Sequence, residues 1–187
     1  MIRSDNRGSE SLFPMYLSAD DGRPNFAAEF VADVAQRTGD VPSPEDLLGY
    51  IYALFHSPKY RERYASDLRS DFPRVLLPAS RDLFAQLAIF GRRLIDVHLL
   101  SEGNGVGSLW PNKSLGSGTR VPAKDSRPLH FRVGGYAALT KWLQPKHRSS
   151  SDPAYEQIAT AIEQTIRLMA AIDAAIDRTG GFPAAFA

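Results

Sequence analysis

Two Ser-Pro pairs, Ser43-Pro44 and Ser57-Pro58, most constrain the fold of this chain, because each one is a helix start. A serine side chain can cap the free N–H groups of a first turn, and proline suits the first helical position. The apolar residues after the first pair fall on one helical face; they are Leu47, Leu48, Ile51, Leu54 and Phe55. The second pair ends this helix and begins another, so the sequence predicts consecutive packed helices.

Three further helices are expected from apolar residues at helical spacing. One runs from about residue 26 to 37 and is closed by Gly39, and a second runs from about residue 80 to 100. The third, from about residue 153 to 177, is amphipathic and about 35 Å long at ~1.5 Å per residue. These helices would form the scaffold of the chain.

Short strands are expected at residues 12–18 and in the weakly alternating stretches 119–123 and 129–133, and a short helix is expected over residues 134–143. We therefore predict a mainly helical α+β fold, with a long C-terminal helix and a small irregular β/loop region. The expected organisation is one domain with a short segment on either side. Its parts are a disordered N-terminus (1–11), a single domain (12–178) and a flexible C-terminal tail (179–187).

Tyrosines and arginines are dense in the segment 60–74. Tyr60, Tyr64 and Leu68 recur every four residues and Phe72 extends the series, which favours a core stripe on a helix whose charged residues 61–63 face water. Direct ligand contact by this helix is the alternative. Asp67 and Asp71, four residues apart, are interpreted as a solvated face.

Charge is distributed unevenly along the 187 residues. Residues 103–151 contain eight basic residues and one acid, a net charge of +7, whereas the remainder contains fourteen basic and twenty acidic residues, a net charge of −6. The basic residues are Lys113, Arg120, Lys124, Arg127, Arg132, Lys141, Lys146 and Arg148. This block, called here the basic window, suggests a surface for a polyanion, with a solvated loop region as the alternative.

Aromatic residues are interspersed with the basic ones, as suits loops that contact nucleic acid. Arg74 lies outside the window, after a proline at an element boundary. Its side chain could pair with a carboxylate inside the protein or with a phosphate outside it.

Enzyme signatures are not found in the sequence. The glycine-rich stretch 103–107 follows a predicted helix rather than a strand, so it does not fit a nucleotide loop. His98 is interpreted as a hydrogen-bonded core residue, and His56 as a residue whose charge or capping contact suits a helix end. The histidines lack metal-ligand spacing, and cysteines are absent. We expect no metal, no cofactor and no catalysis by this chain.

Several segments together resemble a known family. The stretch "YIYALFHSPKYRERYASDLRSDFPRVLLP", preceded by "LFPMYLS" and "RPNF", is similar to the C-terminal specificity domain of type ISP restriction–modification enzymes. "FAQLAIFGRRLIDVHLL", "VGGYAALTKWL" and "TIRLMAAID" resemble that domain in the same order. Type ISP enzymes combine nuclease, translocase, adenine-N6 methyltransferase and target-recognition parts in one polypeptide.

The resemblance implies a non-catalytic target-recognition domain that binds double-stranded DNA for an adenine-N6 methyltransferase located elsewhere. It also implies a cytoplasmic protein of bacterial defence, with no membrane partner, that works with the methyltransferase and translocase parts. The expected DNA contacts are Lys113, Arg120, Lys124, Arg127 and Arg132, with Lys141, Lys146, Arg148 and Arg74 at the periphery. The alternative is a protein-interaction module that docks on a methyltransferase and contacts DNA little. An exposed apolar patch beside the Tyr60/Tyr64 helix or the last helix would favour it.

Overall fold

The computed structural model describes residues 13–17, 22–100, 132–133, 136–137 and 153–186, with backbone only for residues 132–133, 136–137 and 153–156. The elements are α1 (Ala28–Thr38), α2 (Pro44–His56), α3 (Pro58–Arg63), the 3-10 helix η1 (Asp67–Arg69), α4 (Arg81–His98), β1 (Arg132–Val133), β2 (Tyr136–Ala137) and α6 (Pro153–Arg178). The predicted mainly helical fold with a long C-terminal helix is confirmed.

Serine caps begin three of these helices. The side chain of Ser43 accepts a hydrogen bond from the Asp46 N–H at 3.1 Å, and Pro44 occupies the start of α2. Ser80 caps α4 in the same way, accepting from the Leu83 N–H at 3.2 Å. The sequence predicted these starts correctly because capping depends on residues within one turn.

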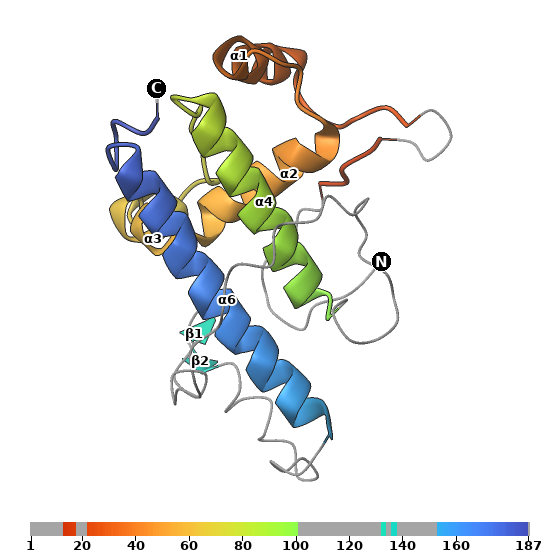
Figure 1. The fold of residues 1–187 in the computed structure, drawn as a ribbon, viewed down its shortest axis with the longest axis vertical. Coiled ribbons are helices and arrows are strands. Elements are labelled where there is room, and N and C mark those ends of the chain that lie inside the picture. Colours follow the sequence, from red (N-terminus) through yellow and green to blue (C-terminus); the bar gives the residue numbers. More distant parts are fainter. Residues whose placement is uncertain (1–12, 18–21, 101–131, 134–135, 138–152, 187) are drawn as a thin grey trace.

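Two glycines set the crossing of α2 and α4, which pack closely against each other (Figure 1). Gly49 of α2 and Gly91 of α4 are both buried and face each other. A Cβ atom on Gly91 would overlap the carbonyl oxygen of Gly49, and one on Gly49 would lie 2.9 Å from the Cγ atom of Arg92. The two backbones therefore approach more closely than any larger residue would allow.

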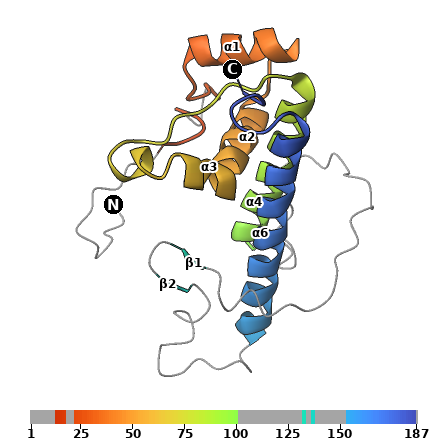
Figure 2. The same cartoon turned by 90° about the vertical axis from the view of Figure 1, so that its left-hand side faces the viewer.

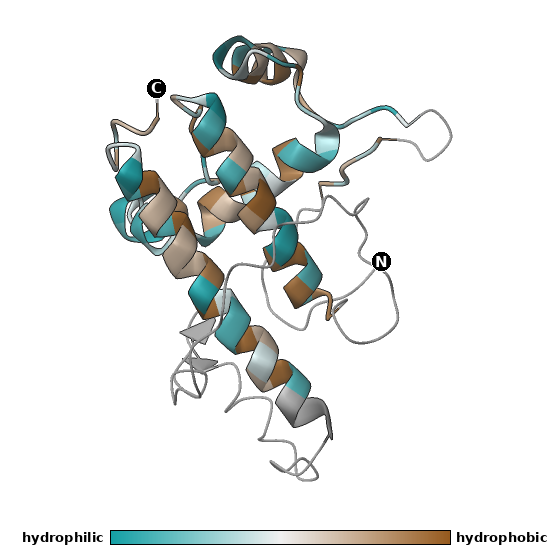
Figure 3. Ribbon diagram, in the orientation of Figure 1, coloured by the Kyte–Doolittle hydropathy of each residue, from teal (hydrophilic) through white to brown (hydrophobic). Residues whose placement is uncertain are grey.

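Helix α6 runs alongside α4 and completes the core (Figures 1 and 2). Hydrophobic and polar residues alternate in patches along both helices, as expected where one face is buried (Figure 3). The fully buried large side chains include Leu47, Tyr50, Leu54, Leu83, Leu87, Leu94, Ile172 and Ile176. Among the described helices, none combines the length and the apolar character that crossing a membrane requires.

The tyrosine stripe ends earlier than the sequence predicted. Helix α3 stops at Arg63, and after η1 the chain is extended from about residue 71 to 78. Tyr60 is buried as expected, but the Phe72 side chain is 66% exposed and is not part of the core. The helical spacing of Tyr60, Tyr64, Leu68 and Phe72 predicted a longer helix, and this was wrong. The chain leaves the helix, and its backbone instead contacts the hydroxyls of two core tyrosines.

Those hydroxyls fix the extended segment by its backbone. The Tyr50 hydroxyl donates a hydrogen bond to the Leu76 carbonyl oxygen at 2.6 Å, and the Tyr60 hydroxyl donates to the Arg74 carbonyl oxygen at 2.7 Å. Buried tyrosines need partners for their hydroxyls, and the extended segment supplies two carbonyls that pair with no strand among the described residues. Tyr60 is therefore a scaffold residue, as the sequence predicted, and so is Tyr50, which was not part of the predicted stripe.

Strand content is small in the described residues. Of the strand expected at 12–18, the described residues 13–17 form an isolated bridge between Tyr16 and Pro24 rather than a strand. Strands β1 and β2 pair antiparallel through two residues each. Tyr136 and Ala137 lie in β2, although a helix was expected from residue 134. Residues 138–143 lie outside the described part of the chain.

The segment after α6 packs against the core. The Ala79 N–H donates to the Ala185 carbonyl oxygen at 3.0 Å, and Pro78 and Phe186 form a bridge. Ala185 is fully buried and the Phe186 side chain stacks on Phe182, with ring centroids 4.9 Å apart. The free tail expected over residues 179–187 is thus, up to residue 186, a packed segment. Its two phenylalanines gave the sequence signal for this.

Candidate functional site

The predicted DNA contacts fall mostly outside the described residues. Those that do are Lys113, Arg120, Lys124, Arg127, Lys141, Lys146 and Arg148. Arg132 lies in β1, where only the backbone is described. Convergence of these side chains on one face stays a prediction.

In the sequence, the basic window nevertheless lies between two helices of the core, α4 and α6. Helix α4 ends at His98 and α6 begins at Pro153, so all eight basic residues of the window lie between these two helix ends. Helices α4 and α6 pack against each other, and α4 also packs on α2. The window is therefore joined at both ends to packed core helices.

Arg74 is the predicted contact whose side chain is described. Its backbone is held by Tyr60, while its side chain is 87% exposed. The guanidinium lies 3.7 Å from the Asp71 carboxylate, an exposed ion pair three residues apart. The sequence left two partners open for Arg74, a carboxylate inside the protein or a phosphate outside it. The structure shows a carboxylate, that of Asp71, but on the surface rather than inside.

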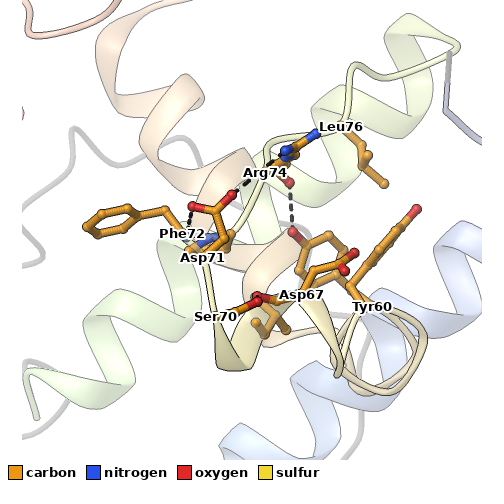
Figure 4. A pocket seen from close by; sticks show the side chains of 10 residues that line it. Tyr60, Asp67, Ser70, Asp71, Phe72, Arg74 and Leu76 are labelled. Carbon is orange, nitrogen blue, oxygen red and sulfur yellow. Dashed lines mark hydrogen bonds and ion pairs between the residues drawn. The ribbon is translucent and has the colours of Figure 1, made fainter.

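A cavity of about 370 Å³ lies beside Arg74 (Figure 4). Its walls include Tyr60, Tyr64, Leu68 and Leu76, and its polar groups include Asp67, Ser70 and Asp71. We call it the tyrosine pocket. The sequence interpreted Asp67 and Asp71 as a solvated face; they are exposed, but both also line this pocket.

Two exposed phenylalanines meet on this side of the molecule. Phe72, which lines the pocket, lies edge-on to Phe13 with ring centroids 6.0 Å apart. Phe13 is 75% exposed and Phe72 66% exposed, so the pair leaves most of its apolar surface in water. This pair, called here the aromatic edge, is the exposed apolar patch that would favour the interaction-module alternative. Phe13 lies in a segment for which the sequence predicts a strand, so its apolar character did not by itself indicate an exposed contact.

A second polar cluster joins α2, α4 and α6 through His98. The Thr165 hydroxyl donates to the Ala161 carbonyl oxygen at 2.8 Å, so it accepts from the Nε2–H group of His98 at 3.0 Å. The His98 Nδ1 atom is then left to accept from the Tyr52 hydroxyl at 2.7 Å. His98 is hydrogen-bonded as predicted, but it lies at the edge of the core with part of its surface exposed rather than inside it.

His56 lies against this cluster. Its ring stacks on Tyr52 at 4.3 Å between centroids and lies 5.3 Å from the ring of His98. Burial lowers the pKa of His56 to about 4, opposed by its hydrogen bond to the Tyr52 carbonyl oxygen and assisted by the charge of Arg61. The imidazole is therefore neutral near pH 7, and its role at the helix end is the hydrogen bond rather than a charge.

Metal-binding groups are not found in the described residues: no three His, Asp or Glu side chains are arranged to hold an ion. The two histidines of the cluster use their ring nitrogens mainly within the protein, as just described. The described site is thus suited to contact and binding, through exposed charge and an exposed aromatic surface.

Comparisons with known proteins bear on what this frame does. The family model described as the type ISP C-terminal specificity domain matches residues 2–128, a range that includes α1 to α4 and part of the basic window. The match ends before β1, β2 and α6, so the later segments of the resemblance lie outside it. No curated protein and no solved structure matches the chain.

A match of this description supports a target-recognition role in a restriction–modification system. It spans more than half of the chain, and it includes the Tyr60 helix and the extended segment that carries Arg74. The chain therefore belongs to the family of type ISP C-terminal specificity domains.

Proposed function

We propose that the chain binds double-stranded DNA and gives sequence specificity to an adenine-N6 methyltransferase located elsewhere. The observation that carries the proposal is the family match together with the placement of the basic window between α4 and α6. Methylation of adenine in duplex DNA requires the base to leave the helical stack. A separate part that holds the duplex in register would supply that chemistry with its target.

In this proposal the basic window makes the contacts. Arg120 and Lys124, with the neighbouring Lys113, Arg127 and Arg132, would bind phosphates, and the arginines could also contact guanine edges in the major groove. Lys141, Lys146, Arg148 and Arg74 would be peripheral contacts. The chain itself would carry out no catalysis, since transfer of the methyl group belongs to the other part of the system.

A salt titration tests this function. With about five phosphate contacts, the logarithm of the DNA affinity should fall against the logarithm of salt concentration with a slope near −4 to −5. Replacing Arg120 and Lys124 by glutamine should bring the slope closer to zero by about two. A matched control replaces Arg37 and Arg178, two exposed arginines of the helical frame, and should leave the slope unchanged. Equal slopes for both double variants would remove the window as the DNA site.

The aromatic edge favours a second candidate function, docking on a methyltransferase partner. Exposed aromatic pairs are common anchors of protein interfaces, and Phe13 and Phe72 are among the most exposed large hydrophobic residues of the described chain. The main contacts of the two functions differ, and the residue they share is Arg74, a peripheral DNA contact that lies beside Phe72 in the lining of the tyrosine pocket. Docking would be supported if the methyltransferase part of the system bound the parent chain and did not bind the Phe13→Ser/Phe72→Ser double variant. Equal binding by the parent chain and the double variant would contradict it.

A further inference from the structure

We propose that the tyrosine pocket is a socket for a lysine or arginine side chain of a protein partner, and that the aromatic edge contacts apolar residues beside that side chain. The proposal rests on the docking function above and names its site and its chemistry. It is independent of DNA binding by the basic window.

The pocket has room for a long side chain. Its volume of about 370 Å³ lies at the low end of the roughly 300–1,000 Å³ usual for ligand sites. Tyr60 and Tyr64 form an aromatic wall, with ring centroids 4.9 Å apart, and Leu68 and Leu76 add an apolar lining. Such walls suit the methylene stem of lysine or arginine, which packs on apolar surface while its charged end reaches polar groups.

The charge of the lining suits a cation. Asp71 accepts the Phe72 N–H at 2.8 Å through Oδ1 and is 3.7 Å from Arg74 through Oδ2, so it is partly compensated. Within the described part of the chain the Asp67 carboxylate has no hydrogen bond or ion pair, and burial together with the charge of Asp67 raises the pKa of Tyr60. The lining therefore offers two carboxylates against one cation, and that cation is 87% exposed to solvent.

A second cation, Arg63, lies next to the aromatic wall, although it is not one of the residues that line the pocket. The guanidinium carbon of Arg63 lies 6.0 Å from the centroid of the Tyr64 ring, within the range of a cation–π contact. An entering cation would meet the rings of Tyr60 and Tyr64 beside the carboxylate of Asp67. A cationic side chain that leaves water for such a site gains a cation–π contact with the rings and a charge-assisted hydrogen bond to the carboxylate.

DNA fits this surface less well than a protein does. Phosphates would meet the carboxylates of Asp67 and Asp71, and that repulsion opposes backbone contact. A polypeptide with a basic residue next to apolar residues would satisfy both the acids and the exposed rings of Phe13 and Phe72. The observations thus favour a protein segment of this composition.

Peptide binding tests the socket directly. The probe is acetyl-Leu-Arg-Leu-amide, compared with the matched peptide in which neutral citrulline replaces arginine, and binding is followed by the amide NMR signals of the full chain. We expect the arginine peptide to bind about five- to tenfold more tightly, as one charge-assisted contact allows, and to shift signals of residues 67–72.

Variants separate the socket from other occupants. Asp67→Asn/Asp71→Asn should abolish the preference for arginine, and Phe72→Ser should weaken both peptides about threefold or more. Val41→Ser is the matched control, because Val41 is 77% exposed elsewhere on the chain and should leave binding unchanged. Equal affinity for both peptides overturns the proposal. So does a Phe72→Ser variant that alters duplex DNA affinity or the oligomeric state instead, since these results would assign the surface to DNA or to a second copy of the chain.

Discussion

The hydroxyl of Ser57 donates a hydrogen bond of 2.5 Å to the Asp173 carboxylate, which joins the start of α3 to α6 across 116 positions of sequence. Ser57 is fully buried, and the same hydroxyl oxygen accepts the Tyr60 N–H at 3.1 Å. The second oxygen of Asp173 accepts the Lys59 N–H at 3.3 Å. Asp173 thus extends the serine cap of α3 with a carboxylate from another helix, at the end where negative charge is favourable.

Removing this carboxylate should destabilise the fold. In Asp173→Ala the buried Ser57 hydroxyl and the Lys59 N–H lose their acceptor, and we expect the free energy of unfolding to fall by about 2–3 kcal/mol. Urea unfolding followed by circular dichroism measures the change. Asp177→Asn is the control, because it breaks only the exposed Lys59–Asp177 pair and should leave the unfolding midpoint nearly unchanged. Equal midpoints for the two variants would show that Asp173 does not hold α3.

The α2–α4 crossing gives a prediction whose sign runs against helix propensity. Alanine in place of an interior helical glycine normally stabilises a helix by about 1 kcal/mol. In Gly91→Ala the new Cβ would overlap the Gly49 carbonyl oxygen, so we expect destabilisation by about 2 kcal/mol or more. Thermal unfolding measures it, with Ala85→Gly on the exposed side of α4 as the reference for propensity alone. A more stable Gly91→Ala variant would mean that the helices do not cross at these glycines.

The tyrosine hydroxyls give a third prediction. Tyr50→Phe removes the bond to the Leu76 carbonyl, and Tyr60→Phe removes the bond to the Arg74 carbonyl. Each loss should cost about 1–2 kcal/mol of unfolding free energy, and each should speed amide hydrogen exchange over residues 71–78. Tyr64→Phe is the control, because that hydroxyl holds no carbonyl of the extended segment. Unchanged exchange in both variants would exclude the tyrosines as anchors of the segment.

The His56–His98 cluster predicts loss of stability on acidification. Burial is the main cause that lowers the pKa of both imidazoles, to about 4 for His56. Between the ordinary histidine pKa of 6.5 and about 4, the unfolded chain binds a proton at His56 that the folded chain does not, so the stability falls as the pH falls. Since His56 is partly exposed, we expect about 1–2 kcal/mol between pH 7 and pH 4.5. The difference in unfolding free energy between the parent chain and His56→Gln, measured across this range, separates the contribution of His56 from that of the carboxylates. A difference that stays constant with pH would contradict the prediction.

Local chemistry explains which features of the fold the sequence predicted. The helix starts at Ser43 and Ser80 depend on contacts within one turn, and they appear where expected. The end of α3 does not appear where the sequence predicted it, because the apolar residues from Tyr60 continue at helical spacing to Phe72. Carbonyls of the segment 71–78 instead accept hydrogen bonds from the hydroxyls of Tyr50 and Tyr60, which the spacing of apolar residues does not reveal. The Ser57–Asp173 bond gave no sequence signal at all, since nothing in either neighbourhood specifies a partner so far away.

The same distinction applies to the candidate sites. Charge counting along the chain located the basic window, because charge is a property of composition. The tyrosine pocket depends on the turn after α3, which brings Asp67, Asp71 and Tyr64 around one cavity, and on a contact between Phe13 and Phe72. Pairing of residues 59 positions apart cannot be inferred from periodicity, so the aromatic edge emerged only from the structure.

Arg74 is the residue at which the proposed DNA and peptide sites make opposite predictions. Its charge is partly compensated by Asp71 at 3.7 Å, so Arg74→Gln should weaken duplex binding less than threefold and change the salt slope by less than one, in contrast to the change of about two for Arg120 and Lys124. The same variant removes the cation from the lining of the tyrosine pocket, and it should strengthen binding of the arginine peptide about twofold or more. Fluorescence anisotropy with duplex DNA and NMR titration with the peptide measure the two effects. Since the side chain is 87% exposed, the unfolding midpoint should stay the same and serves as the control. A large loss of DNA affinity together with unchanged peptide binding would place Arg74 in the DNA site and would leave the pocket without its predicted preference for cations.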